Sequence, residues 1–177
     1  ARGHRVADAM VKKAPVRLLD LGIVSPGKYL IVVSGDVGSV EEAYLEGLQV
    51  GGEWLIDQLF LPQPHDSVVQ ALSRTLPVTP IDALGIVETF SAISAVRSAD
   101  VALKAADVAL LELHYQKHLG GKGYFTVSGE QYSVEAALEA AVSSLRDSGQ
   151  LLTVELIARP HEDFTAHLSG AIMGAQR

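Results

Sequence analysis

The sequence predicts an α+β protein made of two tandem copies of one domain, each with the element order βαββαβ. Two observations lead to this prediction. Four short motifs recur in the same order, 92 to 96 residues apart. Within each copy, segments with strand periodicity alternate with segments of helical periodicity. The first domain is predicted over residues 1–76 and the second over residues 81–177. The segment between them contains Pro77 and Pro80 and reads as a short extended linker.

The composition agrees with this organisation and excludes several functions. A chain of 177 residues with 48% hydrophobic residues can build one large core or two small ones. A formal net charge of −7 argues against a nucleic-acid partner, and no apolar run reaches the ~20 residues of a membrane helix. The sequence has no cysteine, so it can form neither a disulfide nor a thiolate metal site. We therefore expect a cytoplasmic protein without a nucleic-acid or membrane partner.

The repeat is carried by four pairs of motifs. In each pair the second member has similar residues in the same order, and the spacing drifts only by small insertions, which indicates a duplicated domain. The pairs are Ala7–Ala14 with Ala99–Ala106, Gly27–Tyr29 with Gly121–Tyr124, Gly35–Ala43 with Gly129–Ala137, and Pro64–Asp66 with Pro160–Glu162.

The second copy is predicted to contain all six elements, with the helices on one face of the sheet. In its second strand we expect Ala109, Leu111 and Leu113 to share one face, because side chains alternate along a strand. Ser133 is expected to cap the second helix, which carries a clear apolar stripe. The predicted strands are residues 83–89, 108–113, 124–127 and 152–157, and the helices are residues 91–105 and the segment that follows Ser133.

The first copy is predicted to lack its first strand. Ala1 aligns with Ile93, inside the first helix of the second copy, so nothing corresponds to residues 83–89. A sheet without that strand would leave an edge unpaired. The strand is therefore either absent or supplied by something else.

The motifs together resemble the bacterial microcompartment shell-protein family, and the duplication resembles its tandem-domain subclass. The segment Gly22–Leu30 is most similar to the propanediol-utilisation type. The resemblance implies ferredoxin-like domains and a structural shell component that is not an enzyme. The motifs that carry the resemblance are Leu84–Thr89, Ala99–Ala106, Gly121–Glu130 and Arg159–Glu162.

The resemblance also implies an assembly. Three chains would form a trimer with pseudo-sixfold symmetry, with small metabolites passing through an axial pore and other shell proteins meeting its edges. The residues that it places in the pore loops are Val24, Ser25, Pro26, Gly27, Leu119, Gly120 and Gly121. The residues that it places at the tile edge are Lys12, Lys104, Gln63, Arg159, His65 and His161.

Two alternatives to a purely structural tile stay open at this point. One is a trimeric ferredoxin-like regulatory protein that binds a small molecule between subunits. The other is a shell protein with a redox cluster in its pore. The resembled type carries a cluster cysteine where this chain has Ser25, so no iron–sulfur cluster is expected.

No catalytic or metal site is predicted. No Ser/His/Asp triad and no paired carboxylates stand out, and the recurring Asp8 and Asp100 are interpreted as structural. His114 and His118 have the i, i+4 spacing of helical metal ligands. Their segment reads as a strand running into a loop, where this spacing has no such meaning.

The expectation about the cluster can be tested directly. The protein is expected to be colourless and free of iron, whereas Ser25→Cys is expected to create a cluster site, because thiolates are the normal ligands of iron–sulfur clusters. Anaerobic reconstitution of the variant with iron and sulfide would be followed by absorbance and elemental analysis. A variant that shows no iron by either measurement would contradict the hypothesis.

Overall fold

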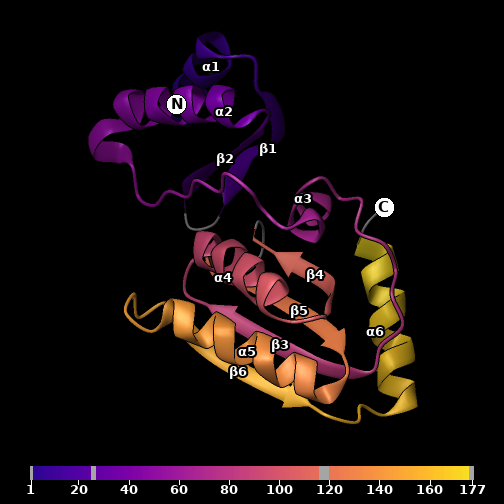
Figure 1. The fold of residues 1–177 in the computed structure, drawn as a ribbon. Coiled ribbons are helices and arrows are strands. Elements are labelled where there is room, and N and C mark those ends of the chain that lie inside the picture. The colour runs from indigo at the N-terminus through magenta and orange to yellow at the C-terminus, as the bar shows by residue number, and fades with distance from the viewer. Residues whose placement is uncertain (1, 25–26, 116–119, 176–177) are drawn as a thin grey trace. The chain divides into compact units, whose positions relative to one another are not determined.

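A computed structural model describes residues 2–24, 27–115 and 120–175 (Figure 1). The chain forms two compact units. The first contains the residues up to Gln63 together with Gly120, and the second contains the residues from Pro64 to Tyr115 and from Gly121 onward. In the part of the chain that the structure describes, no helix is long and apolar enough to cross a membrane.

The second unit contains the predicted βαββαβ order and two further helices (Figure 1). Its four strands pair antiparallel in the order β4-β5-β3-β6. The strands are β3 (Ala83–Thr89), β4 (Ala109–His114), β5 (Gly123–Gly129) and β6 (Leu151–Ile157). The helices are α3 (Asp66–Leu72), α4 (Ala92–Ala105), α5 (Gln131–Leu145) and α6 (Glu162–Ala175).

The core of this unit lies between the sheet and the helices α4 and α5. Phe125 and Val127 of β5 are fully buried there. At Gly85, a Cβ would stand only 2.7 Å from Val134 of α5, so the glycine allows the helix to pack closely on β3. The prediction that the helices cover one face holds for these two. The unpredicted α6 instead contributes Leu168 to a cluster with Leu84 on the other face.

The predicted face of β4 is wrong because the strand contains a β-bulge. Leu110 pairs with Val127, but the register then shifts, so Leu113 pairs with Phe125. Val127 and Phe125 lie on one face of β5, and therefore Leu110 and Leu113 share a face, whereas Leu111 does not. Leu111 instead joins Leu84 and Leu168.

The predicted cap at Ser133 is also wrong. The helix α5 begins at Gln131, and its N-cap is Glu130, whose side chain makes no capping hydrogen bond. Ser133 is buried within the first turn. The matched Asp36 does cap the helix α2, where Oδ1 accepts a hydrogen bond from the Ser39 N–H at 3.0 Å. Hydrogen bonds from Ser39 hold the pKa of Asp36 below its usual value.

The first unit has the same order of elements but a smaller sheet. Strands β1 and β2 pair antiparallel with a bulge after Leu18, matching the bulge after Leu110 in β4. Residues 55–61, which correspond to β6, form no strand. In the second unit β6 pairs with β3, and among the described residues of the first unit no strand corresponds to β3. The elements are α1 (Arg2–Lys13), β1 (Arg17–Val24), β2 (Lys28–Ser34), α2 (Val37–Gly51) and the short 3₁₀ helix η1 (Gly52–Trp54).

The close approach of α4 to β5 gives a test of this packing. A Cβ at Gly123 would lie 2.7 Å from the Ala95 Cβ and 3.0 Å from the backbone atoms Ala92 Cα and His114 O. Because backbone cannot give way as a side chain does, Gly123→Ala is expected to destabilise the protein by about 1–3 kcal/mol in thermal or urea unfolding. The control is Gly22→Ala in β1, where a Cβ has nothing within 4 Å. Equal stability of the two variants would contradict this packing.

Candidate functional site

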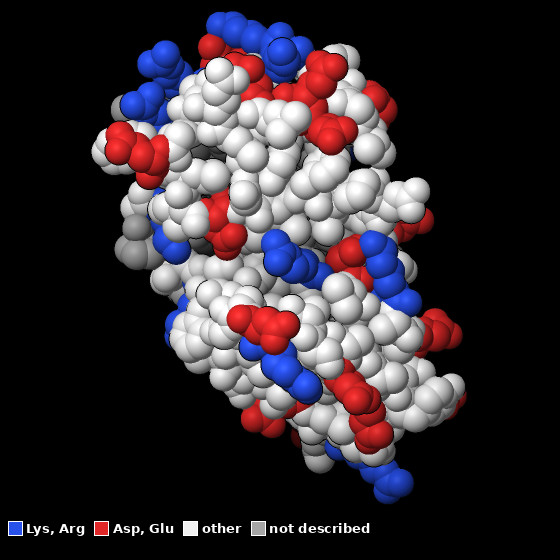
Figure 2. Space-filling model, turned by 60° about the vertical axis from the view of Figure 1, so that its left-hand side comes forward, with Lys and Arg blue, Asp and Glu red and all other residues white. Residues whose placement is uncertain are grey.

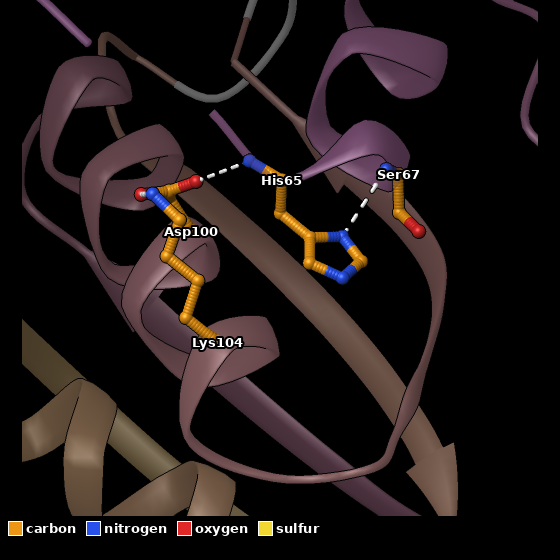
Figure 3. Close-up of polar contacts among 4 residues, drawn as sticks. All are labelled: His65, Ser67, Asp100 and Lys104. Carbon is orange, nitrogen blue, oxygen red and sulfur yellow. Dashed lines mark hydrogen bonds and ion pairs between the residues drawn. The ribbon is translucent and has the colours of Figure 1, made fainter. Parts of the chain in front are cut away.

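The carboxylate of Asp100 joins two segments of the second unit (Figure 3). Its Oδ1 accepts a hydrogen bond from the backbone N–H of His65 at 2.7 Å, and its Oδ2 accepts one from Lys104 Nζ at 2.6 Å. Asp100 and Lys104 lie one turn apart on α4, which brings their side chains together. Asp100 is buried. Both carboxylate oxygens are therefore satisfied, which a buried charge requires.

His65 also begins the helix that this contact anchors. Its Nδ1 accepts a hydrogen bond from the Ser67 N–H at 3.2 Å, which caps α3 (Figure 3). The neutral ring then carries its proton on Nε2. The matched His161 does the same at the start of α6, where Nδ1 accepts from the Asp163 N–H at 3.2 Å. The two histidines therefore have a shared structural role.

Neither α3 nor α6 was predicted from the sequence. The signal that could have found them is the recurring order of proline, histidine and acid. Histidine offers a ring nitrogen to an unpaired N–H of the first turn, and an acid in that turn complements the helix dipole. These acids are Asp66 in α3 and Glu162 and Asp163 in α6.

The first copy repeats the ion pair in a different environment. In α1, Lys12 Nζ lies 2.7 Å from Asp8 Oδ2, with the same four-residue spacing. The Asp8 side chain is 59% exposed, whereas the Asp100 side chain is 5% exposed. The motif is thus covered in one copy and open to solvent in the other.

The remaining predicted edge residues lie at matched places. Gln63 and Arg159 directly precede Pro64 and Pro160, and Arg159 is exposed. The structure brings His65 and Lys104 together through Asp100. The part that these residues play at a tile edge stays a prediction.

The predicted pore loops join equivalent strand pairs in the two units. The first loop follows the buried Val24 at the end of β1, and Gly27 in it has φ +73°. In the loop between β4 and β5, Gly120 and Gly121 have φ +62° and +87°. These values explain the glycines, since other residues rarely adopt them. Ser25, Pro26 and Leu119, and also His118, lie outside the described residues.

A polar cluster that sequence reasoning missed lies beside the second loop. Glu112 Oε1 accepts a hydrogen bond from Thr126 Oγ1 at 3.1 Å, and Oε2 accepts one from the Tyr124 hydroxyl at 3.4 Å. His114 stacks on Tyr124 and places Nε2 2.9 Å from Glu112 Oε2. Burial, with the charge of Glu112, raises the pKa of Tyr124, so the phenol remains a donor. Among the described residues, no three potential ligands gather as a metal site.

Comparison with known proteins identifies related chains. The family model described as the BMC domain matches residues 1–64 and again residues 83–160. The bacterial microcompartment shell protein PduT of Citrobacter freundii is 40% identical over 92% of this chain and 88% of its own length. The carboxysome assembly protein CcmO of Synechococcus elongatus is 27% identical over 89% of this chain and 60% of its own length.

A solved structure agrees with these relatives. The crystal structure of a microcompartment protein from Desulfitobacterium hafniense superposes with a TM-score of 0.87 at 38% identity. The alignment covers 93% of this chain and 92% of that one.

The buried Asp100 contact predicts an unequal effect of two substitutions. Asp100→Ala is expected to lower the free energy of unfolding by about 2–3 kcal/mol, because it leaves the His65 N–H without its acceptor. Asp100→Asn keeps an acceptor oxygen and is therefore expected to lower the free energy of unfolding by less than Asp100→Ala does. The measurement is urea unfolding followed by circular dichroism at one protein concentration. Asp147→Ala, in the exposed turn after α5, serves as the control and is expected to change stability by less than about 0.5 kcal/mol. An Asp100→Ala variant as stable as this control would refute the role of the contact.

Proposed function

The chain belongs to the BMC domain family, and from this premise we propose that it is a structural tile of a bacterial microcompartment shell. The observation that carries the proposal is the tandem match. Two BMC segments follow one another, and the similarity to the shell protein PduT runs through nearly the whole chain. The chain would accordingly reside in a shell within the bacterial cytoplasm.

The tile is a trimer with pseudo-sixfold symmetry. Each chain contributes two copies of one domain, so three chains arranged about a threefold axis supply six domains. When one surface of a subunit binds a different surface of the next, the chains form a ring if the rotation between them closes. The duplicated register of the strand pairs supports near-equivalent places for the two copies in such a ring.

The loops after Val24 and around Gly120–Gly121 line the axial pore of this tile. Glycines with positive φ let the chain turn sharply there. The residue at the position of the cluster cysteine is Ser25, and a hydroxyl is a poor ligand for iron–sulfur clusters, so we expect the pore to pass small polar metabolites and to hold no cluster. The polar groups of Asp100 and Glu112 are engaged in hydrogen bonds within the fold, which supports a structural role over a catalytic one.

Lysines at the end of the first helix of each copy mediate contacts between tiles. A lysine lying along such a contact buries its aliphatic stem while its ammonium group bonds to carbonyl oxygens of the neighbour. The first copy has Gln63 where the second has Arg159, so the two kinds of edge differ in strength.

The lattice contact is tested with Lys12→Ala. This variant is expected to form trimers but no extended sheets in electron microscopy, because the edge loses its lysine. Lys12 is chosen over Lys104 because its partner Asp8 is 59% exposed within the single chain, whereas Lys104 pairs with the buried Asp100. Lys13→Ala is the matched control, since it removes the same charge from the neighbouring exposed position. Sheets of normal extent from Lys12→Ala would contradict the assignment of this edge.

A further inference from the structure

Strand β1 of the first copy and the corresponding strand β4 of the second copy differ in what covers them. Because β1 and β4 carry the same bulge, Leu21 corresponds to Leu113 and Ile23 to Tyr115. Leu113 and Tyr115 are 9% and 5% exposed, whereas Leu21 and Ile23 are 42% and 66% exposed. Leu21 and Ile23 lie two residues apart on β1 and therefore share one face, and Tyr115, which directly follows β4, has the same spacing from Leu113. The first copy thus exposes an apolar face that the second copy buries.

In the second copy β4 packs against α4 and also against α3, and α3 is in the repeat the tail of the first copy. This helix lies against β4 and α4. Its Val68 is fully buried, and the carbonyl oxygen of Leu72 accepts a hydrogen bond from the Tyr115 hydroxyl at 3.5 Å. The His65 N–H joins the tail to Asp100 on α4.

The second copy also ends in a tail, which consists of His161 and α6. The residues of this tail that correspond to His65 and Val68 are exposed. His161 corresponds to His65, and Phe164 corresponds to Val68. Phe164 is 43% exposed although it is a large apolar side chain. Within the described residues, the backbone N–H of His161 has no hydrogen-bond partner. Leu168 packs within its own unit, which leaves the first turn of α6 facing outward.

The charges of the two exposed surfaces are complementary. Helix α1 has four basic residues and a single acid, Asp8, and Figure 2 shows Lys and Arg side chains gathered over it. The first turn of α6 carries Glu162 and Asp163. Opposite charges across a contact favour the encounter and set its orientation.

We propose that the tail of one chain docks on the first copy of a second chain, repeating between molecules the contact that α3 makes within one. The His161 N–H donates to Asp8 Oδ1, and Phe164 covers Leu21 and Ile23. Each chain gives one tail and receives another, so the contact is head-to-tail and closes when the last chain meets the first. The inference rests on the proposed trimer and assigns the residues that hold it together.

The proposal is tested by sedimentation equilibrium of the 177-residue chain and its variants. His161→Pro removes the N–H donor, and Asp8→Ala removes the acceptor. Each is expected to raise the dissociation constant of the contact about tenfold or more, because a hydrogen bond to a charged group is lost. His161→Ala keeps the N–H, so it is expected to raise the dissociation constant less than His161→Pro does. Asp8→Asn keeps an acceptor oxygen, so it is expected to raise the dissociation constant less than Asp8→Ala does. Asp147→Ala, which removes one exposed acid elsewhere, is expected to leave it unchanged.

The outcomes separate this inference from the proposed function. Weakened trimers from both His161→Pro and Asp8→Ala, with the graded effect of the conservative variants, would support the inference. If His161→Pro fails to fold, Asp8→Ala against Asp8→Asn decides, because Asp8 is exposed on a helix surface. Parent trimers whose dissociation is unchanged by Asp8→Ala would overturn the inference alone. A monomeric parent chain would overturn both the inference and the trimeric tile.

Discussion

The contact on which the second unit depends is the buried Asp100 carboxylate. A charge out of water requires partners for both oxygens, and here one partner is a lysine on the same helix and the other is the His65 N–H. His65 stands at the end of the first repeat. The same carboxylate therefore holds the tail of the first copy in place, and with it α3 and the cover over β4. A tandem chain thus builds into one molecule a contact between neighbouring copies.

The sheets of the two units differ in the number of strands that the structure pairs. In the second unit β3 lies between β5 and β6 and pairs with both. Among the described residues, the sheet of the first unit consists of β1 and β2, and residues 55–61 lie outside any strand. Since strands are stabilised by pairing rather than by propensity alone, residues 55–61 have, among the described residues, no partner like the one that β3 gives to β6.

Much of the fold could be predicted from the sequence because the domain occurs twice. The repeat gave the order of elements, and β3 and α4 lie within one residue of the predicted ranges. The bulge in β4 could not be read from alternation, since one extra residue reverses the face of everything after it. The burial of Asp100 and the exposure of Asp8 could not be predicted either, because the two similar motifs differ in what packs on them. The pore and edge residues were named through a family resemblance, and their roles stay predictions.

The central claim is that two tandem domains make each chain one third of a closed, pseudo-hexagonal tile. The most direct measurement is the solution mass of the protein together with negative-stain electron microscopy of the same sample. With a chain mass of 18.8 kDa, the account predicts a trimer of about 56 kDa with a roughly hexagonal outline. A single species with the mass of one chain, or particles without that outline, would contradict it.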